Sequence, residues 1–391
     1  MAETVVIRKG RAKPIWFGHP WVYSEAIART PAGLESDEVR VVDEEDRFIG
    51  RGFFSPRSQI RVRIASRRDE PLDAAWVEGR LAAARDVRAR LGLAGPDTDA
   101  YRLVNSEGDF LPGLVVDVYG DAVVVQFTTA AMKRREAIVF DALAKLLAPR
   151  SLYEAAAGGF AQLEGFSATA RVVRGESRPR VPCRERGLAL EVEPLGGQKT
   201  GWFLDQRENR VAVGALARGA RVLDLYCYAG GFALQAARGG ATAVTAVDSS
   251  ARALERARAH FQANELPTPE LVENDVFRFL EAAPAQAWDL VVCDPPKFAR
   301  AKKDMVAALK GYRRLNALAL AACAPGGLLC TASCSQLVDE QELERVVAGA
   351  AVDARRRVQL LSVSFQAPDH VVPVAFPEGR YLKFLVCRVS E

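Results

Sequence analysis

The second half of the chain alternates between short apolar runs and helix-like segments, and this alternation restricts the fold more than any other feature of the sequence. Alternation of this kind is typical of a parallel sheet with helices on both faces. No helix-like segment separates the last two runs, so we expect an antiparallel hairpin at the sheet edge. The runs predicted to be strands are Arg221–Leu225, Ala243–Val247, Glu270–Val272, Asp289–Cys293, Leu328–Ala332, Gln359–Phe365 and Arg380–Val389, and the helices between them include Ala251–Glu265 and Glu340–Ala350.

The first of these strands leads directly into a glycine turn. Residues 222–231 read Val-Leu-Asp-Leu-Tyr-Cys-Tyr-Ala-Gly-Gly, and a helix-like segment begins at Phe232. Glycine allows turn dihedrals that a Cβ forbids, and it lets a ligand come close to the backbone. A strand, a tight turn and a helix therefore predict a ligand site, although an ordinary strand-to-helix connection has the same outline. The residues expected to contact the ligand here are Asp224, Tyr226, Tyr228, Gly230 and Gly231.

The 391 residues are enough for two or three domains. Residues 1–72 contain short strand-like runs, including the alternating segment Gln59–Ile64, and they predict a small β-barrel. Residues 73–185 predict a central α+β domain, and residues 186–391 contain the alternating α/β pattern described above.

The central domain has its own pattern. Helical spacing of apolar residues predicts a helix over Trp76–Leu91, and Met132–Leu147 predicts a second one. Between them, two alternating segments flank Gly120-Asp121 and predict a hairpin. An Arg-rich connector, Arg171–Arg186, is expected to lead to the third domain.

The composition excludes several classes of protein. At 49% hydrophobic and 26% charged residues the chain is typical of globular proteins, and it has neither a run of ~18 apolar residues nor a signal-peptide core at its start. Its seven cysteines form no C-x-x-C pair and its three histidines lie far apart, so we expect no metal site. We expect a cytoplasmic protein with no membrane partner. Four of the cysteines lie in or beside strand-like runs and are expected to be core residues: Cys227, Cys293, Cys330 and Cys387.

Positive charge gathers in two places, although the net charge is only +4. Two such clusters favour a polyanionic partner, but a solvated protein face can have the same composition. One cluster has seven cations and a single acid, Asp304, and the other has six arginines near the N-terminus. Their members are Lys297, Arg300, Lys302, Lys303, Lys310, Arg313 and Arg314, and Arg51, Arg57, Arg61, Arg63, Arg67 and Arg68.

Polar residues follow the second and third strands, where ligands of such sheets bind. Asp248 stands 24 residues after Asp224 (248 − 224), and an acid there can accept both hydroxyls of a ribose. NAD enzymes and S-adenosylmethionine enzymes share this device, and Asp248 is equally well placed as a helix N-cap before Ser249. After the third strand, the carboxylate and apolar side chains of Asn274-Asp275-Val276 suit an adenine ring.

The fourth strand is followed by Asp294-Pro295-Pro296-Lys297-Phe298. Asp-Pro-Pro at this position indicates a methyltransferase that acts on a planar nitrogen heterocycle, because the prolines stiffen a loop that presents a carbonyl and a side chain to the base. The glycine turn lacks the G-x-G-x-x-G spacing of dinucleotide sites. We therefore expect S-adenosylmethionine as the cofactor in preference to NAD, with Pro295 beside it, and Lys297 and Phe298 beside the substrate.

The fifth strand is followed by Ser333-Cys334-Ser335, which packing explains poorly. Carbon 5 of a pyrimidine is too weak a nucleophile to accept a methyl group directly. A thiolate that adds to carbon 6 activates carbon 5 and divides one hard step into easier ones. We therefore predict that Cys334 is the nucleophile and that Asp294 binds the pyrimidine edge, with Lys297 or the serine turn favouring the thiolate. The base that removes the carbon 5 proton is not identified by the sequence.

Taken together, four segments resemble the bacterial large-subunit (23S) rRNA 5-methylcytosine methyltransferases. The segments are 197–207 (Gly-Gln-Lys-Thr-Gly-Trp-Phe-Leu-Asp-Gln-Arg), 224–232, 294–298 and 333–335. The resemblance extends over nearly the whole chain, with 19–23 similar to the opening of that family's PUA domain and 102–117 similar to its central domain. It implies a PUA-like RNA-binding barrel, a central α+β domain and a Rossmann-like class I methyltransferase domain.

The resemblance also implies functions for residues that no periodicity marks. It gives cofactor or site-shaping roles to Lys199, Thr200, Phe203 and Asp205, and it implies that the barrel and the basic stretches hold an rRNA whose target base is unstacked. Many RNA 5-methylcytosine enzymes have a second cysteine just after Asp-Pro-Pro. This chain has Lys297 there, so Cys334 must act without that partner.

Several functions stay open at this point. A uracil substrate fits the same chemistry, and a related guanine 7-methyltransferase branch shares Asp-Pro-Pro but lacks the Ser-Cys-Ser turn. A non-catalytic RNA-binding ribosome assembly protein would not need Cys334 and Asp294 together. The chain is compatible with a homodimer, but its sequence does not set the oligomeric state, the target nucleotide or whether the substrate is naked rRNA or an assembling subunit.

Overall fold

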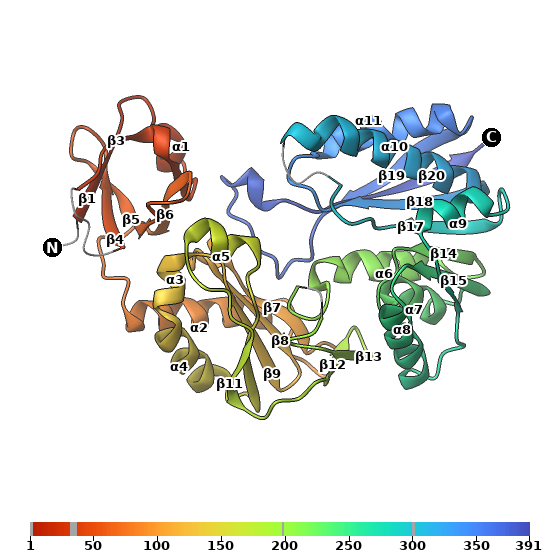
Figure 1. Cartoon of the computed structure of the whole chain (residues 1–391), viewed down its shortest axis with the longest axis horizontal. Coiled ribbons are helices and arrows are strands. Elements are labelled where there is room, and N and C mark those ends of the chain that lie inside the picture. The colour runs from red at the N-terminus through yellow and green to blue at the C-terminus, as the bar shows by residue number, and fades with distance from the viewer. Residues whose placement is uncertain (1–2, 32–36, 198, 299–301) are drawn as a thin grey trace. The chain divides into compact units, whose positions relative to one another are not determined.

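The computed structural model describes residues 3–31, 37–197, 199–298 and 302–391, and they form two compact units (Figure 1). The first unit comprises Met1–Gly187, Glu191–Leu204 and Pro368–Gly379. The second comprises Leu188–Leu190, Asp205–Ala367 and Arg380–Glu391. The C-terminal part of the chain therefore contributes to both units.

The second unit contains a seven-stranded sheet. Its strands are β14 (Arg221–Leu225), β15 (Ala243–Asp248), β16 (Glu270–Glu273), β17 (Trp288–Cys293), β18 (Cys323–Ser333), β19 (Arg357–Ser364) and β20 (Lys383–Ser390). They lie in the order β16-β15-β14-β17-β18-β20-β19. The first five strands of this order run parallel, and β20 is antiparallel to both β18 and β19. The predicted strands, and the antiparallel pair at the edge, are confirmed.

Helices cover both faces of this sheet (Figure 1). They are α6 (Arg207–Leu216), α7 (Gly231–Arg238), α8 (Ala251–Ala263), α9 (Val276–Ala282), α10 (Met305–Ala322) and α11 (Glu340–Asp353). Helices α10 and α11 pack on one face, where Leu315, Leu320 and Leu343 join Leu223 and Val291 of the sheet in one buried cluster. This core fixes the strand ends that carry the predicted site.

The N-terminal part of the first unit is a six-stranded sheet in the order β2-β6-β5-β4-β1-β3. Its strands are β1 (Glu3–Ile7), β2 (Trp21–Tyr23), β3 (Ile27–Arg29), β4 (Glu38–Val42), β5 (Phe48–Phe54) and β6 (Ile60–Ser66), and α1 spans Lys13–Trp16. Alternate residues such as Val39, Val41, Val62 and Ile64 point into one apolar core, as the period of two in the sequence predicts.

A five-stranded sheet follows in the first unit, in the order β11-β10-β9-β8-β7. Its strands are β7 (Ala100–Asn105), β8 (Leu114–Tyr119), β9 (Ala122–Phe127), β10 (Ser151–Glu154) and β11 (Arg171–Gly175), and its helices are α2 (Ala74–Arg90), α3 (Ala130–Arg134), α4 (Glu136–Leu147) and α5 (Gly159–Glu164). The predicted hairpin is confirmed, with Gly120 in the left-handed region at φ 56°. β12 (Val181–Glu185) and β13 (Leu188–Val192) follow in the chain.

Two predictions for this region are wrong. The helix predicted at Met132–Leu147 is interrupted at Arg135, which lies at φ −95° and ψ 13° between α3 and α4. The connector predicted at Arg171–Arg186 contains β11 and β12. Arginines in β11 interrupt the apolar pattern that would predict a strand. In the structure Arg171 pairs with Glu154 and Arg174 pairs with Asp141. Charged side chains are a common protection for an edge strand.

Candidate active site

The parallel strands of the second unit end level with one another. Leu225 at the end of β14 pairs with Val247 of β15 and with Cys293 of β17, and Cys293 in turn pairs with Thr331 of β18. The chain reverses its direction of winding between β14 and β17, and ligands of doubly wound sheets bind in the crevice at that point. The segments that follow these four strands therefore share one edge, as the sequence predicts.

The glycine turn after β14 is held in an unusual conformation. Tyr226, Tyr228 and Gly230 all have positive φ, at 59°, 50° and 78°. Such a conformation costs free energy in a residue other than glycine, and it occurs most often at functional sites. A Cβ on Gly230 would lie 3.0 Å from the Cβ of Ala257, so this position requires glycine both for its dihedrals and for space. Gly231 begins α7 directly afterwards.

Asp248 connects two loops of this edge. One carboxylate oxygen accepts a hydrogen bond from the Tyr228 N–H at 2.9 Å, and the other accepts from the Ser250 N–H at 2.9 Å. The N-cap of α8 is Ser250, whose hydroxyl accepts from the Ala253 N–H, so Asp248 is not that cap. Each carboxylate oxygen keeps a lone pair for a further donor. Ser249 beside it is exposed.

The segment after β16 is partly structural. Asp275 is the N-cap of α9 and accepts from the Arg278 N–H at 3.1 Å. Val276 is buried in the core, whereas Asn274 is half-buried and donates its N–H to the Asp248 carbonyl at 3.1 Å. The predicted ligand contacts of these residues stay predictions.

Asp224 is completely buried beneath the turn. Its Oδ2 accepts from the Ala233 N–H at 2.9 Å, and its Oδ1 has no hydrogen-bond partner among the described residues. The pKa of this carboxyl is raised to about 8, chiefly by burial; the nearby negative charges of Asp294 and Asp248 also raise it, and the hydrogen bond from Ala233 opposes the shift. Asp224 is therefore mostly protonated at neutral pH.

This protonation predicts how Asp224→Asn changes stability with pH. The folded carboxyl keeps its proton up to about pH 8, whereas an unfolded aspartate loses it near pH ~3.9. The contribution of Asp224 to the free energy of unfolding therefore falls as pH rises from about 4 to about 8. Asparagine has no proton to lose, so the melting temperature of the variant minus that of the wild type should increase over this range. Thermal unfolding of both proteins at constant ionic strength measures this difference in melting temperature.

Asp289→Asn provides the control. The hydrogen bond from Arg221 lowers the pKa of Asp289, so its contribution is present above the unfolded pKa and is lost only at more acidic pH. Its difference in melting temperature from the wild type should stay level between pH 5 and 8. A level difference for Asp224→Asn as well would contradict a protonated Asp224.

The Asp-Pro-Pro loop follows β17 immediately. Asp294 is half-buried, Pro295 is buried and Lys297 is exposed. The ring of Phe298 lies 4.6 Å from the ring of Tyr312 in α10, so Phe298 packs on the protein on at least one side. The predicted substrate contacts of Lys297 and Phe298 remain untested.

In the Ser-Cys-Ser turn the two serine side chains are buried and the cysteine between them is half-exposed. Ser333 and Ser335 are buried; the Ser333 hydroxyl donates to the Tyr312 hydroxyl at 3.2 Å, and the Ser335 hydroxyl accepts from the Leu337 N–H at 3.3 Å. Cys334 between them is half-exposed, whereas all six other cysteines are buried. The four cysteines predicted to be core residues are therefore confirmed as such. Burial raises the pKa of Cys323 and Cys387 to about 12, which leaves those thiols unreactive.

A buried lysine next to this turn was missed in the sequence. Lys383 pairs with Ser333 across β20 and β18, and its Nζ donates to the carbonyl oxygens of Ser335 at 2.6 Å and Tyr381 at 2.9 Å. Burial lowers the pKa of Lys383 to about 8, while the negative charges of Cys334 and Asp339 act to raise it. The available signal was a lysine directly before the apolar run Phe384–Cys387.

The residues predicted from segment 197–207 are divided between the units. In the first unit, the buried Thr200 donates its hydroxyl to Asp117, and the Lys199 ammonium lies 4.3 Å from the centre of the Phe203 ring. In the second unit, the Asp205 carboxylate accepts from the Tyr381 hydroxyl at 2.6 Å. Gln198 lies outside the described residues. The ligand roles of these residues stay predictions.

Ion pairs reduce the charge of the basic cluster near this edge. Arg313 pairs with Asp353 at 2.6 Å, and Arg314 pairs with Glu281. Lys297, Lys303 and Lys310 are exposed. Arg300 lies outside the described residues. No group of three or more His, Cys, Asp or Glu side chains suited to a metal ion occurs in the part of the chain that the structure describes. Among the helices described, none has the length and apolarity to cross a membrane.

Known proteins share both parts of this architecture. Residues 5–67 match the PUA-like domain, and residues 166–353 match the S-adenosylmethionine-dependent methyltransferase domain. SMU.776, a candidate methyltransferase crystallised in complex with SAH, superposes with a TM-score of 0.86 at 23% identity, covering 98% of this chain and 99% of the other. At this identity the superposition shows the fold alone.

Sequence relatives extend over the full length. The ribosomal RNA large subunit methyltransferase I of Photobacterium profundum is 39% identical over 402 residues and covers 100% of both chains. The protein of the same name from Klebsiella pneumoniae is 39% identical over 393 residues and covers 98% of both. With its PUA-like domain and its S-adenosylmethionine-dependent methyltransferase domain, the chain belongs to the ribosomal RNA large subunit methyltransferase I family.

Proposed function

We propose that this protein transfers a methyl group from S-adenosylmethionine to carbon 5 of a cytosine in large-subunit rRNA. The names of its full-length relatives support the rRNA substrate. The cytosine and the covalent mechanism rest on one observation, namely that the half-exposed cysteine of the chain follows β18 at the sheet edge where Asp294 follows β17.

The described residues of this edge fit the cofactor. S-adenosylmethionine supplies an electrophilic methyl group on a positively charged sulfonium when it is bound. Asp248 would accept the ribose hydroxyls with its remaining lone pairs, and Asn274 and Asp275 would face the adenine. The strained turn from Tyr226 to Gly230 would lie beside the rest of the molecule. The acids of the edge, Asp248 and Asp294, favour a cationic ligand.

In the proposed reaction, the Cys334 thiolate adds to carbon 6 of the cytosine. The new C–S bond uses the thiolate electron pair, and the displaced electrons of the carbon 5–carbon 6 double bond make carbon 5 nucleophilic enough to accept the methyl group. The electron pair of the broken methyl–sulfur bond would stay on the sulfonium sulfur and neutralise it. A base then removes the carbon 5 proton. The electrons of that C–H bond restore the double bond as the thiolate leaves carbon 6.

Asp294 and Lys383 assist this reaction in different ways. Asp294 hydrogen-bonds the pyrimidine edge, which places carbon 6 at the thiol and stabilises the adduct. The Lys383 ammonium, held beside the turn by two carbonyl groups, favours the thiolate form of Cys334. Because these groups lie at a sheet edge, the target base must leave its stack to reach them.

Nucleoside mass spectrometry identifies the product. Large-subunit rRNA from cells that lack this protein is incubated with the purified protein and S-adenosylmethionine, digested to nucleosides and analysed. We expect 5-methylcytidine to accumulate to about one per rRNA. If 5-methyluridine forms instead, the thiol mechanism still holds but the substrate base is uracil. If 7-methylguanosine is the only product, a carbon 6 adduct is ruled out.

A further inference from the structure

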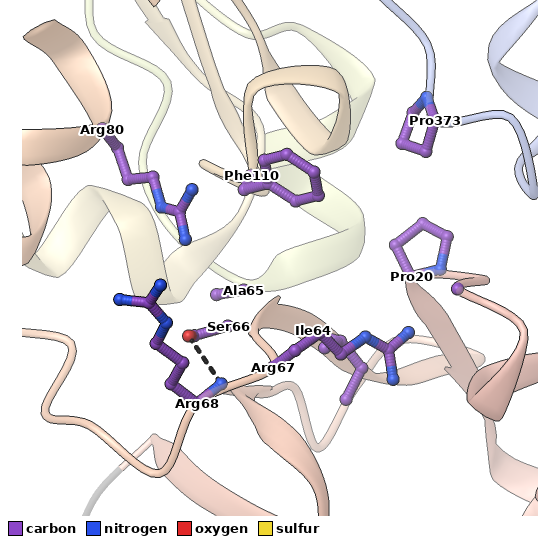
Figure 2. Close-up of a pocket in the computed structure, with 10 residues that line it drawn as sticks. Pro20, Ile64, Ala65, Ser66, Arg67, Arg68, Arg80, Phe110 and Pro373 are labelled. Atoms are coloured by element: carbon purple, nitrogen blue, oxygen red, sulfur yellow. Dashed lines mark hydrogen bonds between the residues drawn. The ribbon is translucent and has the colours of Figure 1, made fainter. Parts of the chain in front are cut away.

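A pocket in the first unit, lined by residues within 18–110 and by Pro373, has a lining suited to a nucleotide. Figure 2 shows Arg68 and Arg80 extending toward one another on one side and Pro20 and Pro373 on the other, with the Phe110 ring between the two sides. The volume is about 180 Å³, and a protein cavity of ~150 Å³ accommodates benzene. The pocket therefore has room for a planar six-membered ring.

The arginines of this pocket have no acidic partners. Among the described residues, no carboxylate lies within ion-pair distance of Arg67, Arg68 or Arg80, whereas other arginines of the same barrel, such as Arg51 and Arg63, each pair with two carboxylates. Arg67 instead donates to the carbonyl oxygen of Ile49 at 3.2 Å and of His19 at 3.4 Å.

The acids next to these arginines in the chain are already engaged. Asp69 pairs with Arg40 and Arg51, and Glu70 accepts from the Ser66 hydroxyl at 2.5 Å. Guanidinium groups gathered without a carboxylate present a site for an anion, and phosphate oxygens suit their fork of donors.

Phe110 is held at the rim of the pocket by a rigid loop. It lies in the left-handed region at φ 58°, and 48% of its surface is exposed. The residues on either side of Gly108 are buried anchors: Glu107 accepts from Trp21 at 2.8 Å and from Arg63 at 3.0 Å, and Asp109 pairs with Arg88. Strain at an exposed aromatic residue directly after such anchors indicates a functional role for the ring.

We propose that this pocket binds an unpaired nucleotide of the RNA substrate, with its base stacked on Phe110 and its flanking phosphates on Arg67, Arg68 and Arg80. Aromatic rings combined with cationic groups that follow the backbone are the usual means of binding single-stranded RNA. The nucleotide lies outside the methylated base, so the pocket contributes affinity and not chemistry. This inference rests on RNA being the substrate, but not on cytosine being the methylated base.

The test measures binding of a fluorescein-labelled single-stranded oligoribonucleotide to the full-length protein by fluorescence anisotropy. Phe110→Ala should weaken binding by about 5- to 150-fold, the range found for loss of one base–aromatic stack, and Phe110→Trp should restore it. Phe160→Ala is the matched control, because Phe160 is an aromatic residue of the same unit with 57% of its surface exposed. Circular dichroism verifies that each variant is folded.

The arginines are tested by the salt dependence of the same binding. The double variant Arg67→Ala/Arg68→Ala should reduce the slope of log K against log salt by about 1.4, because each phosphate contact to a single strand contributes about 0.7. Arg85→Ala, which removes an arginine of α2 paired with Asp86, should leave the slope unchanged. Equal loss for Phe110→Ala and Phe160→Ala, or RNA binding abolished by millimolar inorganic phosphate alone, would overturn the proposal.

Failure of the RNA-binding test at the Phe110 pocket can be distinguished from failure of the proposed methylation reaction. If nucleoside analysis shows a base other than cytosine, the Phe110 and arginine results stand. If RNA is not the substrate, the wild-type protein itself will fail to bind the oligoribonucleotide and the methyl acceptor will be found elsewhere. In a methylation assay the Phe110 variant should raise KM for RNA and leave kcat unchanged, which distinguishes a binding pocket from a catalytic defect.

Discussion

Cys334→Ala should abolish methyl transfer to rRNA and leave the affinity for S-adenosylmethionine unchanged. We expect a fall in kcat of roughly 10⁴-fold or more, the order of loss seen when a covalent nucleophile is removed from other enzymes. Cofactor affinity should persist because Asp248 and the glycine turn follow other strands than Cys334 does. Transfer of a radiolabelled methyl group and isothermal titration with the cofactor measure the two quantities.

Cys330→Ala is the matched control, since it removes a buried thiol from β18, the strand that Cys334 follows. It should reduce stability slightly and retain activity. A second measurement tests the covalent step itself. RNA containing 5-fluorocytidine offers no carbon 5 proton to remove, so the adduct on Cys334 should persist through a denaturing gel. Full activity of Cys334→Ala would refute covalent catalysis by this residue.

Local sequence predicted the second unit well because its central strands β14, β15 and β17 are largely buried. An apolar run such as Val222–Leu225 or Asp289–Cys293 has few other stable positions, and polar residues mark the strand ends. The edge strand β11 could not be predicted in this way. Its residues are largely exposed and its arginines pair with acids of other elements, so its pairing with β10 depends on tertiary contacts that no local pattern contains.

The residues of the site also differ in whether the sequence alone could predict them. Asp294 and Cys334 could be placed because each follows a recognisable strand, and parallel strand ends share an edge. The role of Lys383 could not be inferred, because it depends on the antiparallel register that sets Lys383 opposite Ser333. The pocket around Phe110 was also beyond prediction. Arg51 and Arg68 look equivalent in the sequence, and only the ion pairs of Arg51 distinguish the two.

Lys383→Met should make Cys334 less reactive at neutral pH. With its pKa near 8, Lys383 is mostly protonated at pH 7, and its positive charge favours a thiolate beside it. Loss of this charge should move the pH of half-maximal Cys334 alkylation by iodoacetamide upward by about one unit, which corresponds to a rate about tenfold lower at pH 7. Mass spectrometry of the labelled peptide separates Cys334 from the buried cysteines.

The pH dependence distinguishes an electrostatic role from a purely structural one. Wild-type Lys383 loses its own proton as pH rises through about 8, so the difference between the wild type and Lys383→Met should be largest below pH 8 and should shrink above it. Lys383→Arg keeps the charge and should retain most of the reactivity, and Lys297→Met, which removes an exposed cation of the neighbouring loop, should have a smaller effect. If Lys383→Met reacts like the wild type at every pH while methyl transfer falls, Lys383 positions the turn and does not activate the thiol.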